Sequence, residues 1–391
     1  MVQTVYEVTR AGARHAPAIG APGRPWLDYA GLKTLVDATV AQLNGAGIGR
    51  GDRVALVLPN GPEMAAAFIA VAACATAVPL DPDGSGEALA ELEPRSVIVL
   101  RGADHPASGI PVIELAPQAG GAAGLFTLDV SRLPPGKAKP GPSRGPDIAL
   151  VLRAGTRIVP LTVSNLAASA RHIGAALALT PRDRCLNIMP LASIHGLVAS
   201  VLSSLAAGAS VACAPGFDAA GFLGLLNESK ATWFTAEPAL HQAILAEIAL
   251  DPRGRTGDAH SANLRFVRSS STALAPQIMS ALEEAFGCPV IESYGMTEAA
   301  HQMASNALPP GRRKPGSVGL HAGPKIAIMD ADGKILPRGQ TGEIVVQGPN
   351  VTLGYEGDPD ANQRAFTEEW FRTGDQGRFD EDGYLFVTGR V

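Results

Sequence analysis

Residues 293–298, Ser-Tyr-Gly-Met-Thr-Glu, combine a hydroxyl, an aromatic ring, a turn glycine and a carboxylate in one short segment. An apolar run at 288–291 precedes this segment and predicts a buried strand. Open α/β sheets bind their ligands outside the carboxyl ends of the strands. The pattern therefore predicts a ligand-binding loop at 293–298. Alternatively, Thr297 and Glu298 only cap a helix through their side chains.

The composition indicates a globular protein with a large core. The chain has 391 residues, of which 46% are hydrophobic and 18% charged, with a net charge of -5. This length favours two or three structural units that need no covalent cross-links. The mildly acidic balance gives no basic surface for nucleic acid, so we expect no nucleic-acid partner.

The cysteines are spaced too widely for a zinc site or a disulfide framework. They are Cys74, Cys185, Cys213 and Cys288. No two of them form a C-x-x-C pair. Free thiols are typical of reducing compartments, so the sequence predicts a cytoplasmic protein.

Two long stretches without Asp, Glu, Lys or Arg, at 64–80 and 185–217, raise the question of a membrane span. The first is shorter than the roughly 20 apolar residues a span requires, and Pro, Ser and His interrupt the second. Both favour buried helices that run into strands. The charged residues of 7–15 exclude a signal peptide.

The first half of the chain alternates between strand and helix patterns. Apolar runs at 53–58, 77–80 and 96–100 predict buried strands. Strand–helix–strand order is typical of a parallel α/β sheet. The Pro-, Gly-, Lys- and Ser-rich segment 134–146 predicts an exposed connector. We therefore expect a first α/β subdomain over 1–146.

A second α/β subdomain is expected over 147–314, since a strand pattern at 147–152 precedes helical periodicity at 161–177. Short strands are also expected at 210–213 and 232–235. From 315 to 388 the pattern changes to that of an antiparallel β subdomain. The expected strands there are 325–329, 342–347 and 384–387, separated by Asp-Gly and Arg-Gly turns.

Four segments together resemble the large N-terminal part of an adenylate-forming enzyme, the superfamily of acyl-CoA synthetases, luciferases and adenylation domains. They are 271–274 (Ser-Thr-Ala-Leu), 293–298, 370–375 (Trp-Phe-Arg-Thr-Gly-Asp) and 389–390 (Gly-Arg). They occur in the family's order and with compatible gaps. This agreement strengthens the interpretation of each segment as a family motif. The resemblance covers nearly the whole chain and is closest to ligases for small acids, of the oxalate and malonate kind.

The resemblance implies an ATP-dependent acid–CoA ligase. Such enzymes join a carboxylic acid to ATP, release pyrophosphate and pass the acyl group from acyl-AMP to a thiol. Coenzyme A is the usual acceptor, and a carrier-protein thiol is the alternative. The implied cofactors are ATP or AMP, Mg²⁺ and coenzyme A. The sequence leaves open which acid is used and the oligomeric state.

The resemblance also assigns roles around the nucleotide. Thr297 would contact the α-phosphate and Glu298 would hold Mg²⁺, a hard cation that prefers oxygen ligands. Asp375 and Arg390 would hold the ribose, and Tyr294 would stack on adenine. Alternatively, Asp375 belongs to ordinary turn chemistry. The other implied nucleotide-binding positions are Gly155, Thr156, Ser271, Thr272, Ala273, Ser293, Gly295 and Met296.

The chain departs from the family at the phosphate-binding loop, 153–162. The family pattern Ser-Gly-Thr-Thr-Gly-x-Pro-Lys is about four residues longer there, a judgement made against loops that cradle phosphates. Thr156 would still meet phosphate and metal, and Arg157 stands where the catalytic Lys would be. Two interpretations stay open: the loop is truly this short, or the natural loop is longer. A truly short loop favours a degenerate member that binds an acyl or nucleotide ligand without turnover.

The acid-binding residues are expected at three places. His195 lies in a segment that resembles the family's acyl pocket, although a lone His is as often a core residue. Arg268 and Ser269 resemble the segment that meets the distal carboxylate of small diacids, as a bidentate Arg can. Glu237 would neutralise Arg268 if the two pair, which would argue against a diacid.

Two final expectations concern the pocket floor and the end of the chain. His301, Gln302 and Met303 would line the floor of the acid pocket, with core packing as the alternative for Met303. Residues 389–391 resemble the start of the hinge to the family's small C-terminal domain. That domain is absent from this chain, and it would carry the Lys that drives adenylation.

Overall fold

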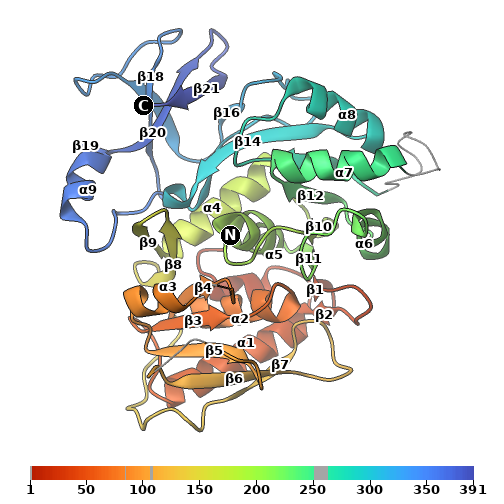
Figure 1. Ribbon diagram of the computed structural model, residues 1–391, viewed down its shortest axis with the longest axis vertical. Coiled ribbons are helices and arrows are strands. Elements are labelled where there is room, and N and C mark those ends of the chain that lie inside the picture. Colours follow the sequence, from red (N-terminus) through yellow and green to blue (C-terminus); the bar gives the residue numbers. More distant parts are fainter. Residues whose placement is uncertain (1, 84, 106–108, 251–262) are drawn as a thin grey trace.

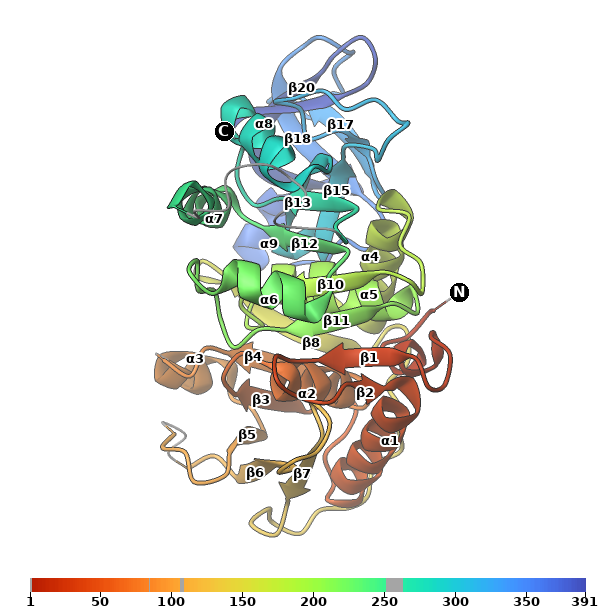
Figure 2. The same ribbon diagram turned by 90° about the vertical axis from the view of Figure 1, so that its right-hand side faces the viewer.

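The computed structural model describes residues 2–83, 85–105, 109–250 and 263–391. Three β-sheets follow one another along the long axis of the molecule. The N-terminal α/β layer lies at one end and the C-terminal β unit at the other (Figure 1, Figure 2). This architecture confirms the predicted fold class of two α/β layers and a smaller antiparallel β unit.

The first sheet has seven strands in the order β7-β6-β5-β3-β4-β8-β9. The pairs among β6, β5, β3, β4 and β8 are parallel, and the outer strands β7 and β9 are antiparallel to their neighbours. The strands are β3 (Arg53–Val57), β4 (Thr76–Leu80), β5 (Ser96–Leu100), β6 (Val112–Pro117), β7 (Phe126–Asp129), β8 (Ile148–Ala154) and β9 (Arg157–Thr162). The helices of this layer are α1 (Tyr29–Gly45), α2 (Pro62–Ala72) and α3 (Ser85–Leu92).

Helix α2 is buried between the first two sheets. It begins with Pro62 in its first turn, where the missing amide proton costs nothing, and only Glu63 is not buried. It contacts strands of both sheets. A helix that is apolar on all sides must be covered on all sides. The uncharged stretch 64–80 is therefore a core helix that runs into β4, as expected.

The second sheet has nine strands in the order β16-β15-β14-β13-β12-β10-β11-β1-β2. Its interior pairs from β14 to β1 are parallel. The strands are β1 (Pro17–Gly20), β2 (Leu27–Asp28), β10 (Arg184–Asn187), β11 (Ser210–Cys213), β12 (Trp233–Ala236), β13 (Phe266–Ser269), β14 (Val290–Met296), β15 (His301–Ser305) and β16 (Leu320–His321). The helices are α4 (Val163–Ala176), the π-helix η2 (His195–Leu202), α5 (Ser203–Ala206), α6 (Phe222–Ser229), α7 (Pro238–Leu250) and α8 (Pro276–Phe286).

The boundary between the first and the second sheet does not fall at residue 146, where the sequence suggested a boundary between subdomains. Strands β8 and β9 complete the first sheet, because β8 pairs in parallel with β4 through Ala77 and Leu150. Strands β1 and β2 belong instead to the second sheet, where Ile19 pairs with Val211. The ranges 1–146 and 147–314 therefore mix strands of both sheets. Chain order alone does not decide which strands become neighbours.

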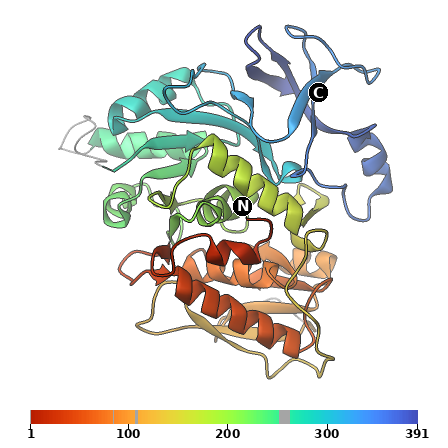
Figure 3. The same cartoon turned by 180° about the vertical axis from the view of Figure 1, so that it is seen from behind.

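Helix α4 connects the layers. Its N-cap Thr162 is the last residue of β9 and forms a reciprocal capping box with Asn165. The Asn165 amide also donates to the carbonyls of Pro349 and Val351 in the C-terminal part. Seen from behind, α4 and α1 lie on the same side of the molecule (Figure 3). One helix start thereby holds a loop of the β unit against the second layer.

The third sheet is antiparallel, with the order β17-β18-β20-β19 and β21 paired to β20. Its strands are β17 (Lys325–Met329), β18 (Gly342–Gln347), β19 (Phe366–Thr367), β20 (Trp370–Phe379) and β21 (Leu385–Arg390), with helix α9 (Pro359–Ala365) before β19. No helix within the described ranges is both long and apolar enough to cross a membrane.

Candidate active site

The segment 293–298 is mostly strand, which corrects the predicted loop. Strand β14 continues through Met296 and pairs with β15, which lies antiparallel to it. Only Thr297–Ala299 leaves the strand, as a short 3-10 turn. The apolar run at 288–291 marks only the part of β14 that is flanked by parallel strands. The second half has a partner because residues 301–305 fold back on it, which the local pattern does not encode.

Gly295 permits that close pairing. A Cβ atom at this position would lie 1.7 Å from the carbonyl oxygen of His301. No side chain fits at that distance, so the β14–β15 pair requires glycine here. The turn between these strands also holds Ala300 and His301 at φ values of 46° and 99°. A non-glycine residue at positive φ is strained and is typical of functional sites.

Tyr294 joins the second sheet to the third. Its hydroxyl donates to Oδ2 of Asp375 on β20 across 2.5 Å. The other oxygen of Asp375 pairs with Nε of Arg390 on β21 at 3.0 Å. Burial, followed by the charge of Asp375, raises the pKa of Tyr294 and keeps it a donor. The predicted adenine and ribose residues are therefore in direct contact.

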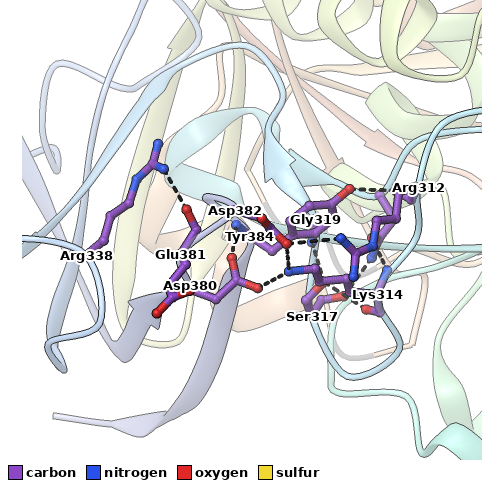
Figure 4. A network of polar contacts seen from close by, with 10 residues as sticks. Arg312, Lys314, Ser317, Gly319, Arg338, Asp380, Glu381, Asp382 and Tyr384 are labelled. Carbon is purple, nitrogen blue, oxygen red and sulfur yellow. Dashed lines mark hydrogen bonds and ion pairs between the residues drawn. The ribbon is translucent and has the colours of Figure 1, made fainter.

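A polar network holds the β20–β21 hairpin at its other end (Figure 4). Lys314 pairs with Asp380 and, at 2.6 Å, with Asp382. The Tyr384 hydroxyl donates to the carbonyl of Arg312 at 2.8 Å. These contacts tie the hairpin turn to the segment that follows β15. The network thus supports the two strands that carry Asp375 and Arg390.

A cavity of about 650 Å³ lies where the β8–β9 hairpin, the end of β14 and the third sheet meet. Among the predicted nucleotide residues, those that line it are Gly155, Arg157, Met296, Thr297, Glu298 and Arg390. Gly374, next to Asp375, lines it as well. Glu298, just after β14, and Arg390, on β21, therefore face one shared space, and Asp375 is joined to it through its ion pair with Arg390.

Glu298 is held from the side by Tyr355. The Tyr355 hydroxyl donates to Oε1 of Glu298 at 2.9 Å and accepts from Nη1 of Arg157 at 3.2 Å. The Arg157 guanidinium also stacks 4.6 Å from the centre of the Tyr355 ring. Burial and the charge of Glu298 raise the pKa of Tyr355 to about 12. The ring therefore positions both the carboxylate and the cation.

Glu298 suits magnesium better than a transition metal. Within the described residues, no group of three or more His, Cys, Asp or Glu side chains is arranged as a metal site. Mg²⁺ usually binds through one or two protein carboxylates, with substrate phosphates and waters completing its shell. Glu298, 7% exposed and facing the cavity, fits that mode, whereas Glu343, the other carboxylate in the cavity lining, is paired with Arg372.

The predicted phosphate loop is a tight hairpin. Ala154 of β8 pairs with Arg157 of β9, so only Gly155 and Thr156 form the turn, and Gly155 has φ +63°. Thr156 is exposed and is not among the residues that line the cavity. The turn is too short to wrap around a triphosphate.

A second cluster surrounds Arg268, at the carboxyl ends of β12 and β13. Arg268 donates to Thr235 at 3.3 Å and to Gln302 at 3.3 Å, and it lies 3.4 Å from Nδ1 of His301. His195 contacts Thr235 at 2.7 Å, and its ring lies 4.9 Å from that of His301. Every side chain in this cluster is buried.

The positive charge of Arg268 in this cluster is not balanced by a carboxylate of the described residues. Arg268 is 0% exposed and forms no ion pair within the described parts of the chain. Its Nε has no hydrogen-bond partner there. Burial lowers the pKa of Arg268 to about 9. Burial and the Arg268 charge also lower the pKa values of His195 and His301 well below the ordinary value. A buried cation among neutral histidines lacks a counter-ion.

Glu237 does not supply that counter-ion. No ion pair joins it to Arg268, although both residues lie in the described ranges. The pairing considered as the alternative is therefore not formed. The Glu237 backbone carbonyl instead accepts from Leu240 and His241 at the start of α7.

The other predicted residues lie at varied distances from these two centres. Ser271, at φ +83°, contacts His195 at 3.3 Å. Ser293 donates to the carbonyl of Ser269 at 3.2 Å. Met303 is 0% exposed and packs in the main hydrophobic core, which agrees with the alternative of core packing. Thr272 and Ala273 are exposed, and neither lines the cavity.

Sequence reasoning missed Tyr355, Arg364 and Thr235. Tyr355 and Arg364 lie between β18 and β20, in a segment without a recognised motif. The pair Gly354-Tyr355 before a Pro-initiated helix offered a weak signal, since an aromatic residue after a turn glycine is unusual on a surface. Gln302, expected beside His301 in the pocket floor, accepts from Arg268.

The fold and the cavity define a nucleotide-binding enzyme of the adenylate-forming kind. The chain belongs to the AMP-binding enzyme family, whose model matches residues 7–124 and 157–356. The matched ranges leave out β7, the connector and β8, and resume at Arg157. The predicted family is therefore confirmed.

Relatives and solved structures agree with this membership. The oxalate–CoA ligase of Arabidopsis thaliana is 40% identical over 96% of this chain and 76% of its own length. The sulfoacetate–CoA ligase of Cupriavidus necator is 35% identical over 93% and 73%. Apo MatB from Rhodopseudomonas palustris aligns with a TM-score of 0.85 at 27% identity, over all of this chain and 79% of its own. The predicted class, an AMP-forming acid–CoA ligase, agrees with these relatives.

Proposed function

We propose that this protein activates a small carboxylic acid with ATP and transfers it to coenzyme A. One observation carries the proposal: Glu298 and Arg390, the ion-pair partner of Asp375, line the same 650 Å³ cavity. A nucleotide in that cavity would have its phosphates near Glu298 and its sugar near Asp375. The named activities of the oxalate and sulfoacetate ligases support the same reaction class.

Each residue of the cavity then has a defined task. Thr297 would donate to the α-phosphate, and Arg157 would contribute positive charge toward the phosphates. Glu298, oriented by Tyr355, would hold Mg²⁺, which when bound neutralises phosphate charge. Asp375 would accept from the ribose hydroxyls, with Arg390 beside it. Tyr294 would place Asp375 through its hydroxyl and offer its ring to adenine.

The acid is proposed to carry a second anionic group. A buried guanidinium without a carboxylate partner is costly, and an incoming anion would remove that cost. Arg268 can bind a planar carboxylate through two parallel hydrogen bonds. His195 and His301, kept neutral, would leave the Arg268 charge uncancelled and add hydrogen bonds. Oxalate, malonate and sulfoacetate are acids of this chemistry.

ATP–pyrophosphate exchange tests the reaction and the acid class together. We expect the full-length protein to exchange fastest with oxalate, malonate or sulfoacetate, and slowly with acetate or butyrate. Arg268→Lys keeps the charge and should retain part of that preference, whereas Arg268→Gln should abolish it. Glu237→Ala is the matched control and should leave the preference unchanged. Exchange with none of these acids would refute the proposal.

A second candidate is a family member that binds an acyl or nucleotide ligand without turnover. The two-residue turn at Gly155 and Thr156 favours it, because such a turn offers few amides to a triphosphate. The two candidates differ in one measurement. A ligand-binding protein would show saturable binding of ATP or acid in calorimetry and no pyrophosphate exchange under the same conditions.

The acceptor and the location are also proposals. Coenzyme A is favoured over a carrier-protein thiol because the relatives are named CoA ligases. Parallel assays with coenzyme A and with a phosphopantetheinylated carrier protein would separate the two. Cytoplasmic location is supported by the four cysteines, which are all buried free thiols.

A further inference from the structure

Four arginines line the cavity, and two of them already have carboxylate partners. Arg372 pairs with Glu343 at 2.5 Å, and Arg390 pairs with Asp375 at 3.0 Å. Arg157 and Arg364 have no carboxylate partner within the described ranges, and both are exposed. The cavity lining therefore includes two arginines that form no ion pair with a carboxylate of the described residues.

Tyr355 fixes the geometry around these two arginines. Its hydroxyl and ring hold Arg157 from β9. Its backbone is clamped by Asn362 of α9, which accepts from the Tyr355 amide at 2.6 Å and donates to its carbonyl at 2.7 Å. Arg364 lies two residues after Asn362 on the same helix. Tyr355 thus contacts Arg157 directly and is bonded to the helix that carries Arg364.

Helix α9 is itself well anchored. Asp358 caps its start by accepting from the amide of Ala361 at 2.8 Å. Ala361 and Ala365 are buried, and Arg364 is exposed. Residues three and four positions apart share one face of a helix, and all three of these residues line the cavity, so this face of α9 places Arg364 there.

The short β8–β9 turn leaves the polyphosphate without its usual contacts. Gly155 and Thr156 provide at most two turn amides, and Thr156 does not line the cavity. Cationic side chains that contact the phosphates must therefore come from other elements of the fold. Arg364 and Arg157 flank the cavity that also contains Glu298, the proposed magnesium carboxylate.

We propose that Arg364, together with Arg157, forms a binding pair for the β- and γ-phosphates of ATP and for pyrophosphate. This rests on the proposed function, because it assumes that the cavity binds the nucleotide. Guanidinium groups suit phosphate because their planar donors bind two oxygens at once. In this chain, α9 thereby takes over part of the task of a longer phosphate loop.

Calorimetric titration with ATP, AMP, pyrophosphate and coenzyme A, at fixed Mg²⁺, tests the pair. We expect Arg364→Gln to weaken ATP and pyrophosphate about tenfold, the loss of one charge-assisted hydrogen bond. AMP should change less than about twofold, because it lacks the outer phosphates. Arg364→Lys should retain part of the ATP affinity, and Arg157→Gln combined with Arg364→Gln should lose more than either alone.

The matched control is Arg182→Gln, which removes an exposed arginine at the opposite, amino end of β10. It should leave all four affinities unchanged. Equal weakening of AMP and ATP by Arg364→Gln would overturn the pair, since it indicates a structural role in α9. Unchanged ATP affinity, or a selective loss of coenzyme A, would overturn it as well. In these cases the proposed function survives, whereas a wild-type protein that binds neither ATP nor AMP refutes both.

Discussion

Tyr294 donates a 2.5 Å hydrogen bond to Asp375 and so connects the end of β14 with the middle of β20. The two residues lie 81 positions apart in the chain. Each residue belongs to a segment that, taken alone, is also compatible with a structural role and no ligand. Their contact joins the second sheet to the third, next to Met296 and Gly374, which line the cavity.

Removing this contact should weaken nucleotide binding. For Tyr294→Phe we expect AMP affinity to fall several-fold and the free energy of unfolding to fall by about 1–2 kcal/mol, because Asp375 loses one donor. Calorimetry with AMP and urea unfolding measure the two effects. Tyr6→Phe is a matched control, since it removes a Tyr6–Asp37 hydrogen bond of 2.5 Å outside the cavity. An AMP affinity that Tyr294→Phe leaves unchanged would contradict the prediction.

Glu292 should make stability depend on pH. Burial raises its pKa from 4.5 to about 7 in the folded state. The folded protein therefore binds more protons than the unfolded chain between pH 4.5 and 7, and this residue makes stability fall as pH rises through that window. Glu292→Gln, which can still accept from Gly316, should gain about 2 kcal/mol relative to wild type between pH 4.5 and 8.

Urea unfolding of both proteins across that pH range measures the difference. Since other groups titrate equally in the two proteins, the comparison isolates Glu292. Curves that stay parallel from pH 4.5 to 8 would show that Glu292 has an ordinary pKa.

Gly295 and Gly174 should respond in opposite ways to alanine. Gly295→Ala places a methyl group 1.7 Å from the His301 carbonyl, so we expect a loss above about 3 kcal/mol or failure to fold. Gly174 lies inside α4, where a Cβ meets nothing within 4 Å. Gly174→Ala should stabilise the protein by about 0.5–1 kcal/mol. Thermal unfolding ranks the variants, and a folded Gly295→Ala protein of wild-type stability would refute the close approach.

Lys314→Met should loosen the β20–β21 hairpin without unfolding the rest. Lys314 holds Asp380 and Asp382, and its hydrogen bond lowers the pKa of Asp382 below the ordinary value (Figure 4). The stabilisation is therefore present above pH 3.8 and is lost as pH falls through the lowered pKa. We expect faster amide hydrogen exchange at 379–385 in the variant at neutral pH, with unchanged exchange in β10–β13. Equally faster hydrogen exchange in the second and the third sheet would contradict a local role for Lys314.

Local patterns predicted much of the fold. The apolar runs at 53–58 and 96–100 became β3 and β5, and the periodic segment 161–177 became α4. These succeed because burial on both faces, or on one helical stripe, is visible in consecutive residues. The placement of β1 beside β11 was not predictable, because strand neighbours depend on distant segments.

The candidate site was predictable only in part. Thr297, Glu298 and Asp375 were predicted because their segments resemble the family's motifs, whereas the residues alone also allow helix capping or turn chemistry. Tyr355 and Arg364 carry no such signal, and their importance comes from what they touch or line. The sequence also does not show whether Arg268 has a carboxylate partner. Whether Glu237 reaches Arg268 is a matter of side-chain direction, which sequence spacing does not give.

Local patterns in the chain were enough to predict most of the strand and helix segments, and the resemblance of four short motifs was enough to predict the family. The first follows from periodicity in consecutive residues, and the second from motifs that occur together in the family's order. Three features appeared only in the folded molecule: the pairing of β14 with β15, the two-residue turn at the predicted phosphate loop, and the lack of a counter-ion for Arg268 among the described residues. Each of these depends on contacts between residues far apart in the chain, and such contacts exist only after the sheets have assembled.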